Sequence, residues 1–178
     1  MKKFENINFN GKNIILTSTN PDDSGIIAAT IIDGDSQGSV VNFSDGETSE
    51  AVLTGFTITG GCGTLFNEEA IFGREAIIIG GGIYCIDASP TIKNNVITSN
   101  YTGSTEQSSA IEDWGGGIGC LGSSATIAHN IIKDNSAVLG GGILVASGDI
   151  EIINNLIYGN TASDAGGGVL TVAGRLIN

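Results

Sequence analysis

A glycine triplet followed by a fixed phrase constrains the fold of this chain more than any other feature. Gly-Gly-Gly-Ile at 80–83 recurs at 115–118 and 140–143, and as Gly-Gly-Gly-Val at 166–169. The first three copies each continue into Ile-x-x-Asn-x-[Ile]-x-x-Asn and span 21 residues from first glycine to last asparagine. A repeat held in register without gaps predicts a stack of identical structural units.

Each unit contains two or three apolar segments of three to five residues, separated by Gly, Asn or Asp-Gly. Such segments are too short for helices, which need ten or more residues with a helical stripe. Stacked short strands bury one continuous core, and about 22 to 26 residues per coil is typical of a three-sided parallel β-helix. A leucine-rich repeat is the rival, but this chain uses isoleucine, with 27 residues, in place of regularly spaced leucines.

We therefore expect an all-β, three-sided parallel β-helix of roughly seven coils. Residues 1–178 then form one β-helix domain, which is either complete or a fragment of a longer β-helix. Weaker copies of the pattern predict further strands upstream, at 13–16, 30–33, 39–43 and 55–60.

Composition narrows the range of partners and locations. The net charge of −12 disfavours nucleic acid and anionic membrane surfaces. The sequence has no apolar run near the roughly 18 residues of a membrane span. After Met1 to Lys3 the charged segment Phe4-Glu5-Asn6 replaces the apolar part of a secretion signal. We nevertheless expect an extracellular or cell-surface location, with this chain as a processed piece.

Residues in the same register stack in columns along such a rod. An asparagine amide both donates and accepts, so stacked asparagines can bond to each other and to the turn backbone. We interpret two asparagine columns as structural ladders. The first column contains Asn95, Asn130 and Asn155. The second contains Asn100, Asn135 and Asn160.

Cysteine and histidine positions also follow from the repeat. Cys85 and Cys120 occupy the same register and should point inward, as reduced thiols that act as small hydrophobic groups. Strand spacing would bring the two residues close enough for a disulfide, but their parallel side chains make the torsion angle about the S–S bond difficult to reach. His129, the only histidine, replaces an asparagine equivalent to Asn94 and Asn154, so we expect a turn role.

Two insertions, 61–79 and 101–114, leave the rod at one corner on neighbouring coils and form long loops. Such insertions often mark a binding face. Our candidate ligand-binding residues are Trp114, Tyr84, Glu68 and Glu69. A tryptophan beside carboxylates can bind sugar, and clustered carboxylates can take Ca²⁺. The competing interpretation is that Trp114, with Leu65, Phe66, Phe72 and Ile111, packs the loops onto the rod.

Gly-Gly-Gly-Ile followed by Ile-x-x-Asn-x-Ile-x-x-Asn resembles the right-handed parallel β-helix repeats of the pectate-lyase-like superfamily. The paired motifs are also similar to those of chlamydial polymorphic outer-membrane proteins. The resemblance implies a right-handed rod, and it extends closely over 80–178 and loosely over 10–60. It does not imply one activity, because the superfamily includes lyases, hydrolases, epimerases, adhesins and spacers.

The lyases of this superfamily carry aspartates that bind Ca²⁺ on the matching strand, whereas here the first carboxylate is Asp87, at an edge. The Gly-His-Gly segment of related hydrolases is absent. We therefore expect a non-catalytic module of a secreted or surface protein, acting in adhesion, spacing or glycan contact. The alternative is a polysaccharide lyase or glycoside hydrolase with its site beneath the two insertions, where Glu112 or Asp113 would act together with Arg74.

The coil ends predict self-association. Strands at the end of a solenoid are open to pairing with another chain unless they are capped. We expect a homo-oligomer through a coil end. Two-fold pairing closes, whereas head-to-tail stacking continues into fibres, so a dimer is the simpler soluble outcome.

Overall fold

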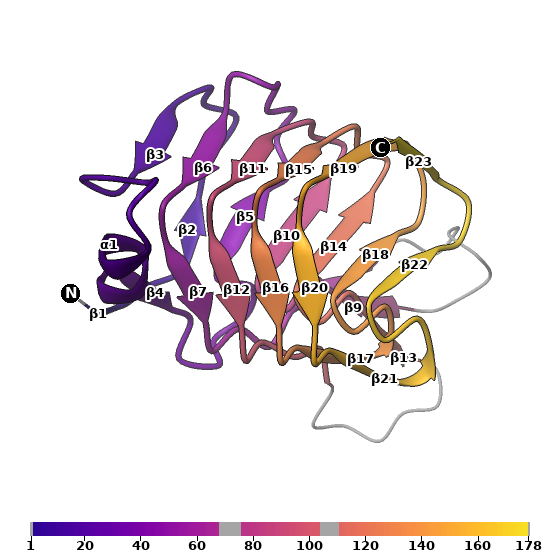
Figure 1. Cartoon of the computed structure of the whole chain (residues 1–178). Helices are drawn as coiled ribbons and strands as arrows, with labels where there is room; N and C mark the ends of the chain where they lie inside the picture. Colours follow the sequence, from indigo (N-terminus) through magenta and orange to yellow (C-terminus); the bar gives the residue numbers. More distant parts are fainter. Residues whose placement is uncertain (1, 68–75, 104–110, 178) are drawn as a thin grey trace.

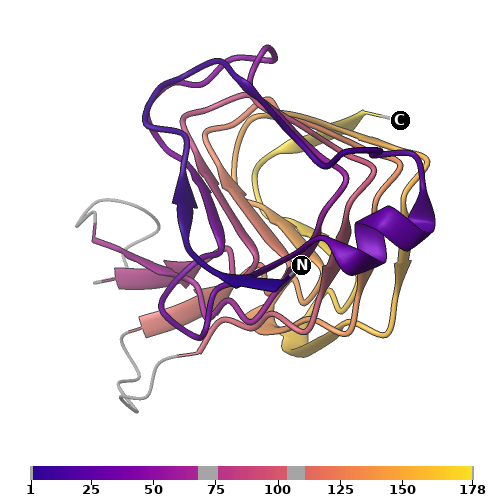
Figure 2. The same cartoon turned by 90° about the vertical axis from the view of Figure 1, so that its left-hand side faces the viewer.

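The computed structural model describes residues 2–67, 76–103 and 111–177. In these ranges the chain winds into a rod whose three long walls are parallel sheets of six strands each (Figures 1 and 2). Successive strands move from one wall to the next, so every strand pairs with its copy one coil away. The predicted parallel β-helix is confirmed, and the described rod has six turns where the sequence predicted roughly seven.

We name the long walls sheets A, B and C. Sheet A contains β1 (Lys2–Phe4), β4 (Ile31–Asp33), β7 (Thr57–Thr59), β12 (Val96–Thr98), β16 (Ile131–Lys133) and β20 (Leu156–Tyr158). Sheet B contains β2 (Ile7–Asn8), β5 (Val41–Phe43), β10 (Ile83–Ile86), β14 (Ile118–Leu121), β18 (Ile143–Val145) and β22 (Val169–Thr171). Sheet C contains β3 (Ile15–Thr17), β6 (Val52–Thr54), β11 (Thr91–Lys93), β15 (Thr126–Ala128), β19 (Asp149–Ile153) and β23 (Arg175–Ile177).

A fourth sheet, sheet D, lies at one corner and has five strands. They are β8 (Thr64–Phe66), β9 (Ala76–Ile79), β13 (Ile111–Trp114), β17 (Ser136–Leu139) and β21 (Thr161–Ala165). Its pairs are parallel except for the β8–β9 hairpin. The sequence predicted long loops at this corner, but parts of both insertions extend a sheet because β17 and β21 supply an edge for them to pair with.

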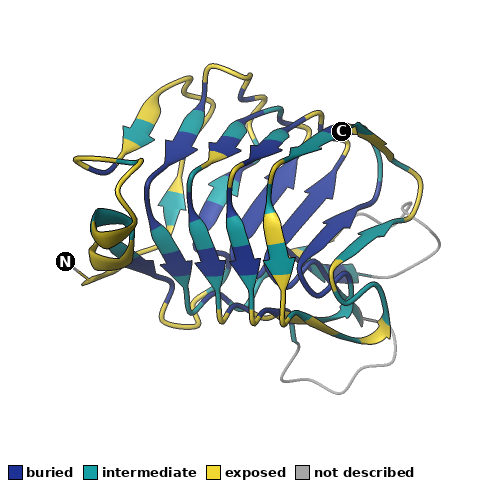
Figure 3. Cartoon of the chain, in the orientation of Figure 1, coloured by how far each residue is buried: buried dark blue, intermediate teal, exposed yellow. Residues whose placement is uncertain are grey.

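The interior of the rod consists of columns of aliphatic side chains. In sheet B, Ile83, Ile118 and Ile143 are register partners on successive coils, and all three are fully buried. Burial is deepest in the middle coils and decreases towards both ends (Figure 3). The repeat therefore builds the core by placing the same β-branched residue at the same point of each coil.

The two asparagine columns form hydrogen-bonded ladders. The Asn95 backbone N–H donates to Asn130 Oδ1 at 3.0 Å, and the Asn130 N–H donates to Asn155 Oδ1 at 2.9 Å. In the second column, the Asn100 and Asn135 N–H groups donate to the next Oδ1, both at 3.0 Å. Side-chain Nδ2 groups also donate to strand carbonyls. Each amide thus satisfies backbone groups at a corner where the strands end.

The turn that precedes the first ladder uses left-handed backbone. His129 has φ of 56°, close to the 53° of Asn94 and the 51° of Asn154 in neighbouring coils. Asparagine tolerates this region better than most residues because its short amide can bond locally. His129 therefore occupies a turn, as its place in the repeat predicted.

The sequence analysis predicted no helix, but the structure has one in the described ranges. The helix α1 (Ser24–Ala29) lies between β3 and β4, and the Asp23 carboxylate accepts from Gly25 N at 2.8 Å and Ile26 N at 3.2 Å. This N-cap supports a helix shorter than the ten-residue threshold used for sequence prediction. No helix in the described ranges has the length and apolar character needed to cross a membrane.

Candidate functional site

Sheet D brings the two insertions together at the predicted corner. β9 and β13 pair in parallel, so Ile77 lies opposite Glu112 and Ile79 lies opposite Trp114. The two insertions therefore meet as adjacent strands. This is the place where the sequence analysis located a binding face.

Sheet D covers the outer face of sheet B, and a second apolar core fills the space between them. In an ordinary coil the outward side chain of a strand is exposed, but here the outward Tyr84 is only 8% exposed and Leu144 is fully buried. Trp114 is 3% exposed within the same cluster. The buried members of this second core are Ile77, Ile79, Tyr84, Ile86, Trp114, Leu121, Leu144 and Ala146.

Gly119 allows the outer layer to approach the rod closely. It occupies the outward position of β14, between Tyr84 and Leu144 in register. A Cβ on Gly119 would lie 2.3 Å from Ile79 Cγ1 and 2.7 Å from the Gly80 nitrogen. Only glycine leaves room for this contact, since the Gly80 backbone cannot move aside without breaking its pairing.

The burial of Trp114 and Tyr84 favours the packing interpretation of this corner over sugar stacking. Both rings were candidate ligand contacts, yet each presents almost no surface to solvent. The indole Nε1–H of Trp114 donates to Glu112 Oε2 at 3.0 Å. The tryptophan's polar group and the glutamate are thus engaged with each other inside the layer.

The two candidate carboxylates lie on opposite faces of one strand. Glu112 and Asp113 are consecutive in β13, and successive side chains of a strand point to opposite faces. Glu112 shares its face with Trp114, so Asp113 is directed to the other side. Arg74, the expected partner of either carboxylate, lies outside the described residues.

The remaining candidates lie outside the described residues. Glu68, Glu69 and Arg74 belong to the stretch 68–75, as does Phe72. Within the described ranges, no three His, Cys, Asp or Glu side chains gather at a common point where a metal ion could be held.

Two of the three cysteines occupy the interior. Cys85 and Cys120 are register partners, fully buried, with free thiols. Cys85 Sγ contacts Ser123 Oγ at 3.4 Å. Hydrogen bonding with Cys85, together with burial, raises the pKa of the Cys120 thiol well above its ordinary value. A protonated thiol is a poor nucleophile, so this pair acts in packing.

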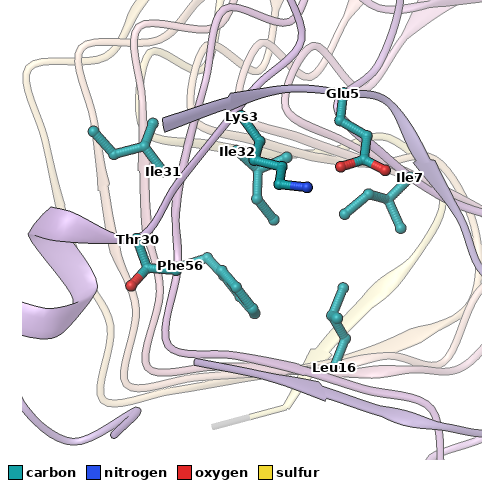
Figure 4. Close-up of a pocket in the computed structure, with 8 residues that line it drawn as sticks. All are labelled: Lys3, Glu5, Ile7, Leu16, Thr30, Ile31, Ile32 and Phe56. Carbon is teal, nitrogen blue, oxygen red and sulfur yellow. The ribbon is translucent and has the colours of Figure 1, made fainter. Parts of the chain in front are cut away.

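A hollow that the sequence analysis did not identify opens at the N-terminal end of the rod (Figure 4). It has a volume of about 240 Å³, and Lys3 and Glu5 from the first coil extend over its mouth. Its walls include the apolar side chains of Ile7, Leu16, Ile31, Ile32 and Phe56. The signal was present in the sequence, because Lys3 occupies the register position that isoleucine fills in the next coil.

Comparison with protein-family models, with curated proteins and with solved structures gives no match for this chain.

Proposed function

We propose that this chain is a non-catalytic β-helix module of the pectate-lyase-like type, belonging to a secreted or cell-surface protein. It serves as a rigid spacer in adhesion and contacts glycans along its side. The observation that carries this proposal is the packing of two candidate site residues, Trp114 and Tyr84, in the second core. Trp114 is buried and bonded to Glu112, while Asp113 lies on the opposite side of the strand.

The rod itself suits a spacer. Three ladders of main-chain hydrogen bonds and two asparagine ladders run along it. Each coil is locked to the next on every side, so bending requires many bonds to stretch together. A stiff rod holds a binding surface at a fixed place and loses little conformational entropy when that surface is bound, which is useful in adhesion.

The outer face of sheet A is the surface that we propose for glycan contact. Its two outward columns contain hydroxyl, β-branched and aromatic side chains in a regular array. Strands along the rod are spaced about 4.8 Å apart, so an extended polymer meets one side chain of each column at that spacing. Tyr158, 48% exposed in this face, offers a ring to a sugar. One column contains Thr57, Val96, Ile131 and Leu156, and the other contains Thr59, Thr98, Lys133 and Tyr158.

Polysaccharide incubation tests both parts of the proposal. Purified chain is mixed with acidic and neutral polysaccharides, with and without Ca²⁺, while absorbance of unsaturated products and reducing ends are followed. We expect no turnover, and retardation in gels containing a bound polysaccharide. Tyr158→Ala should weaken that retardation, whereas Tyr84→Phe, a change inside the second core, should not.

Turnover would contradict the non-catalytic assignment. If Glu112→Gln, Asp113→Asn or Arg74→Gln then abolished it, the chain would be a lyase or hydrolase with its site at the insertions. Binding that persists in Tyr158→Ala would move the glycan surface away from sheet A.

A further inference from the structure

The chain contains one Asn-Gly dipeptide, Asn10-Gly11, in the loop between β2 and β3. Both residues have left-handed backbone, with φ of 51° and 69°. The Lys12 N–H donates to the Phe9 carbonyl at 3.0 Å, so residues 9–12 form a type I′ turn. Glycine has no side chain to shield its nitrogen, so an Asn-Gly pair is an open place for attack of a backbone nitrogen on a side-chain amide.

This attack converts the asparagine to aspartate or isoaspartate. The Gly11 nitrogen forms a bond to Asn10 Cγ while the Cγ–Nδ2 bond breaks. Ammonia leaves with the proton of the Gly11 N–H, and a succinimide ring remains. Water then opens the ring at Cγ, which gives aspartate, or at the main-chain carbonyl carbon, which gives isoaspartate with an extra carbon in its main chain. Water is consumed and ammonia is released, and nothing is oxidised or reduced.

The folded turn keeps the reacting atoms apart. The succinimide ring requires the Gly11 nitrogen and the Asn10 Cβ to lie on the same side of the bond between Cα and the carbonyl carbon of Asn10. In a type I′ turn they lie on nearly opposite sides of this bond. The turn must therefore open before the new bond can form, and the contacts of the turn determine how often it opens.

A buried carboxylate holds the turn in place. Glu47 lies in the loop between β5 and β6 and is only 1% exposed. Its Oε1 accepts from the Gly11 N–H at 2.9 Å, and its Oε2 accepts from the Asp45 N–H at 3.0 Å. Opening of the turn removes a donor from a carboxylate that water does not reach. Hydrogen bonds to charged groups are strong, so this contact makes opening rare.

We infer that Asn10 is a deamidation site that Glu47 protects in the folded chain, so that modification follows local opening of this loop. The change is one-way, because hydrolysis does not rebuild the amide. It also affects the main core, since Phe9 precedes Asn10, is 2% exposed and packs on Phe43 with ring centroids 4.3 Å apart. Isoaspartate at position 10 lengthens the turn that directs Phe9 inward. This inference does not depend on the proposed function.

Mass spectrometry of the peptide that contains Asn10 tests the inference. Purified chain is incubated at neutral pH, folded or in urea, and the fractions of asparagine, aspartate and isoaspartate are followed. Unfolded wild type should deamidate more than about tenfold faster than folded wild type. Glu47→Gln should accelerate deamidation of the folded chain about tenfold, because the glutamine amide turns its NH₂ group towards one of the two N–H donors.

Glu50→Gln is the matched control. It makes the same chemical change at an exposed position of the same loop and should leave the rate unchanged. Circular dichroism and urea melts verify that both variants are folded.

Hydrogen exchange in wild type tests the contact without a substitution at Glu47. If opening of the Gly11 N–H limits deamidation, the factor by which its exchange is slowed should equal, within about threefold, the factor by which folding slows deamidation. Freely exchanging Gly11, or wild type that deamidates equally fast folded and unfolded, would overturn the inference. A folded Glu47→Gln variant that reacts no faster than Glu50→Gln would overturn it too.

Discussion

The molecule has two apolar cores that arise in different ways. The core inside the rod is built by repetition, with Ile83, Ile118 and Ile143 stacked in one column. The core between sheets B and D forms where the insertions cover the rod, and the three register partners that face it, Tyr84, Gly119 and Leu144, differ in size. A repeat can specify a column of equal side chains. An irregular layer needs each position to fit its own neighbours.

The sharpest comparison of the two cores uses neighbours on one strand. Ile143 and Leu144 are consecutive in β18 and both fully buried, the first in the inner core and the second in the outer one. We expect Ile143→Ala and Leu144→Ala each to lower the free energy of unfolding by about 2–5 kcal/mol. Urea melts followed by circular dichroism measure both. A Leu144→Ala cost below about 1 kcal/mol would mean that sheet D adds little to the rod.

Removing one amide from a ladder tests the polar part of the repeated structure. In Asn130→Leu, the backbone N–H and the Nδ2 group of Asn95 lose their shared acceptor while remaining buried. We expect a loss of about 1–3 kcal/mol in denaturant melts. Lys93→Leu, an exposed change on the neighbouring strand, should stay within about 0.5 kcal/mol as the control. A neutral Asn130→Leu would show that water replaces the ladder.

Asp33 ties the edge strand β1 to the rod in a pH-dependent way. Burial opposes ionisation of this carboxyl, but hydrogen bonds from Lys2 and from the Asp35 N–H outweigh burial, so its pKa is lowered. The stability that these contacts add is fully present above the pKa that this carboxyl has in the unfolded chain. It is lost as the pH falls through the lower pKa that the carboxyl has in the folded chain.

We expect Asp33→Asn to cost about 1 kcal/mol near neutral pH, a modest value because Lys2 is half exposed. The difference between wild type and variant should shrink as pH falls below the carboxyl range. Urea melts at several pH values measure it. A difference that is constant with pH would show that the ion pair does not contribute.

The smallest effect is expected at a turn of the repeated part. His129→Asn restores the residue used at 94 and 154, and should change stability by no more than about 0.5 kcal/mol. His129→Val places a β-branched residue in left-handed backbone and should cost about 1–2 kcal/mol. Thermal melts of both variants distinguish a turn role from any role of the imidazole. Equal stability of the two variants would contradict the turn interpretation.

The repeat made the rod predictable because its side chains are periodic. The register of Asn130 and of Ile118 follows from counting residues from one glycine triplet to the next. Sheet D was missed because 61–79 and 101–114 have no counterpart of equal length in other coils. The helix α1 was missed because its stability comes from the Asp23 cap, a local contact too short to leave a helical stripe.

The sequence by itself determined the coil, the order of strands and the columns inside the rod, because neighbouring coils impose one spacing on every repeated residue. Only the tertiary structure decided the environment of Trp114. Whether an outward ring faces solvent or a second layer depends on which segment folds back over it, and here β9 pairs with β13 above sheet B. Tertiary structure also decided that Lys3 lines a hollow, because a hollow exists only where separate strands enclose it.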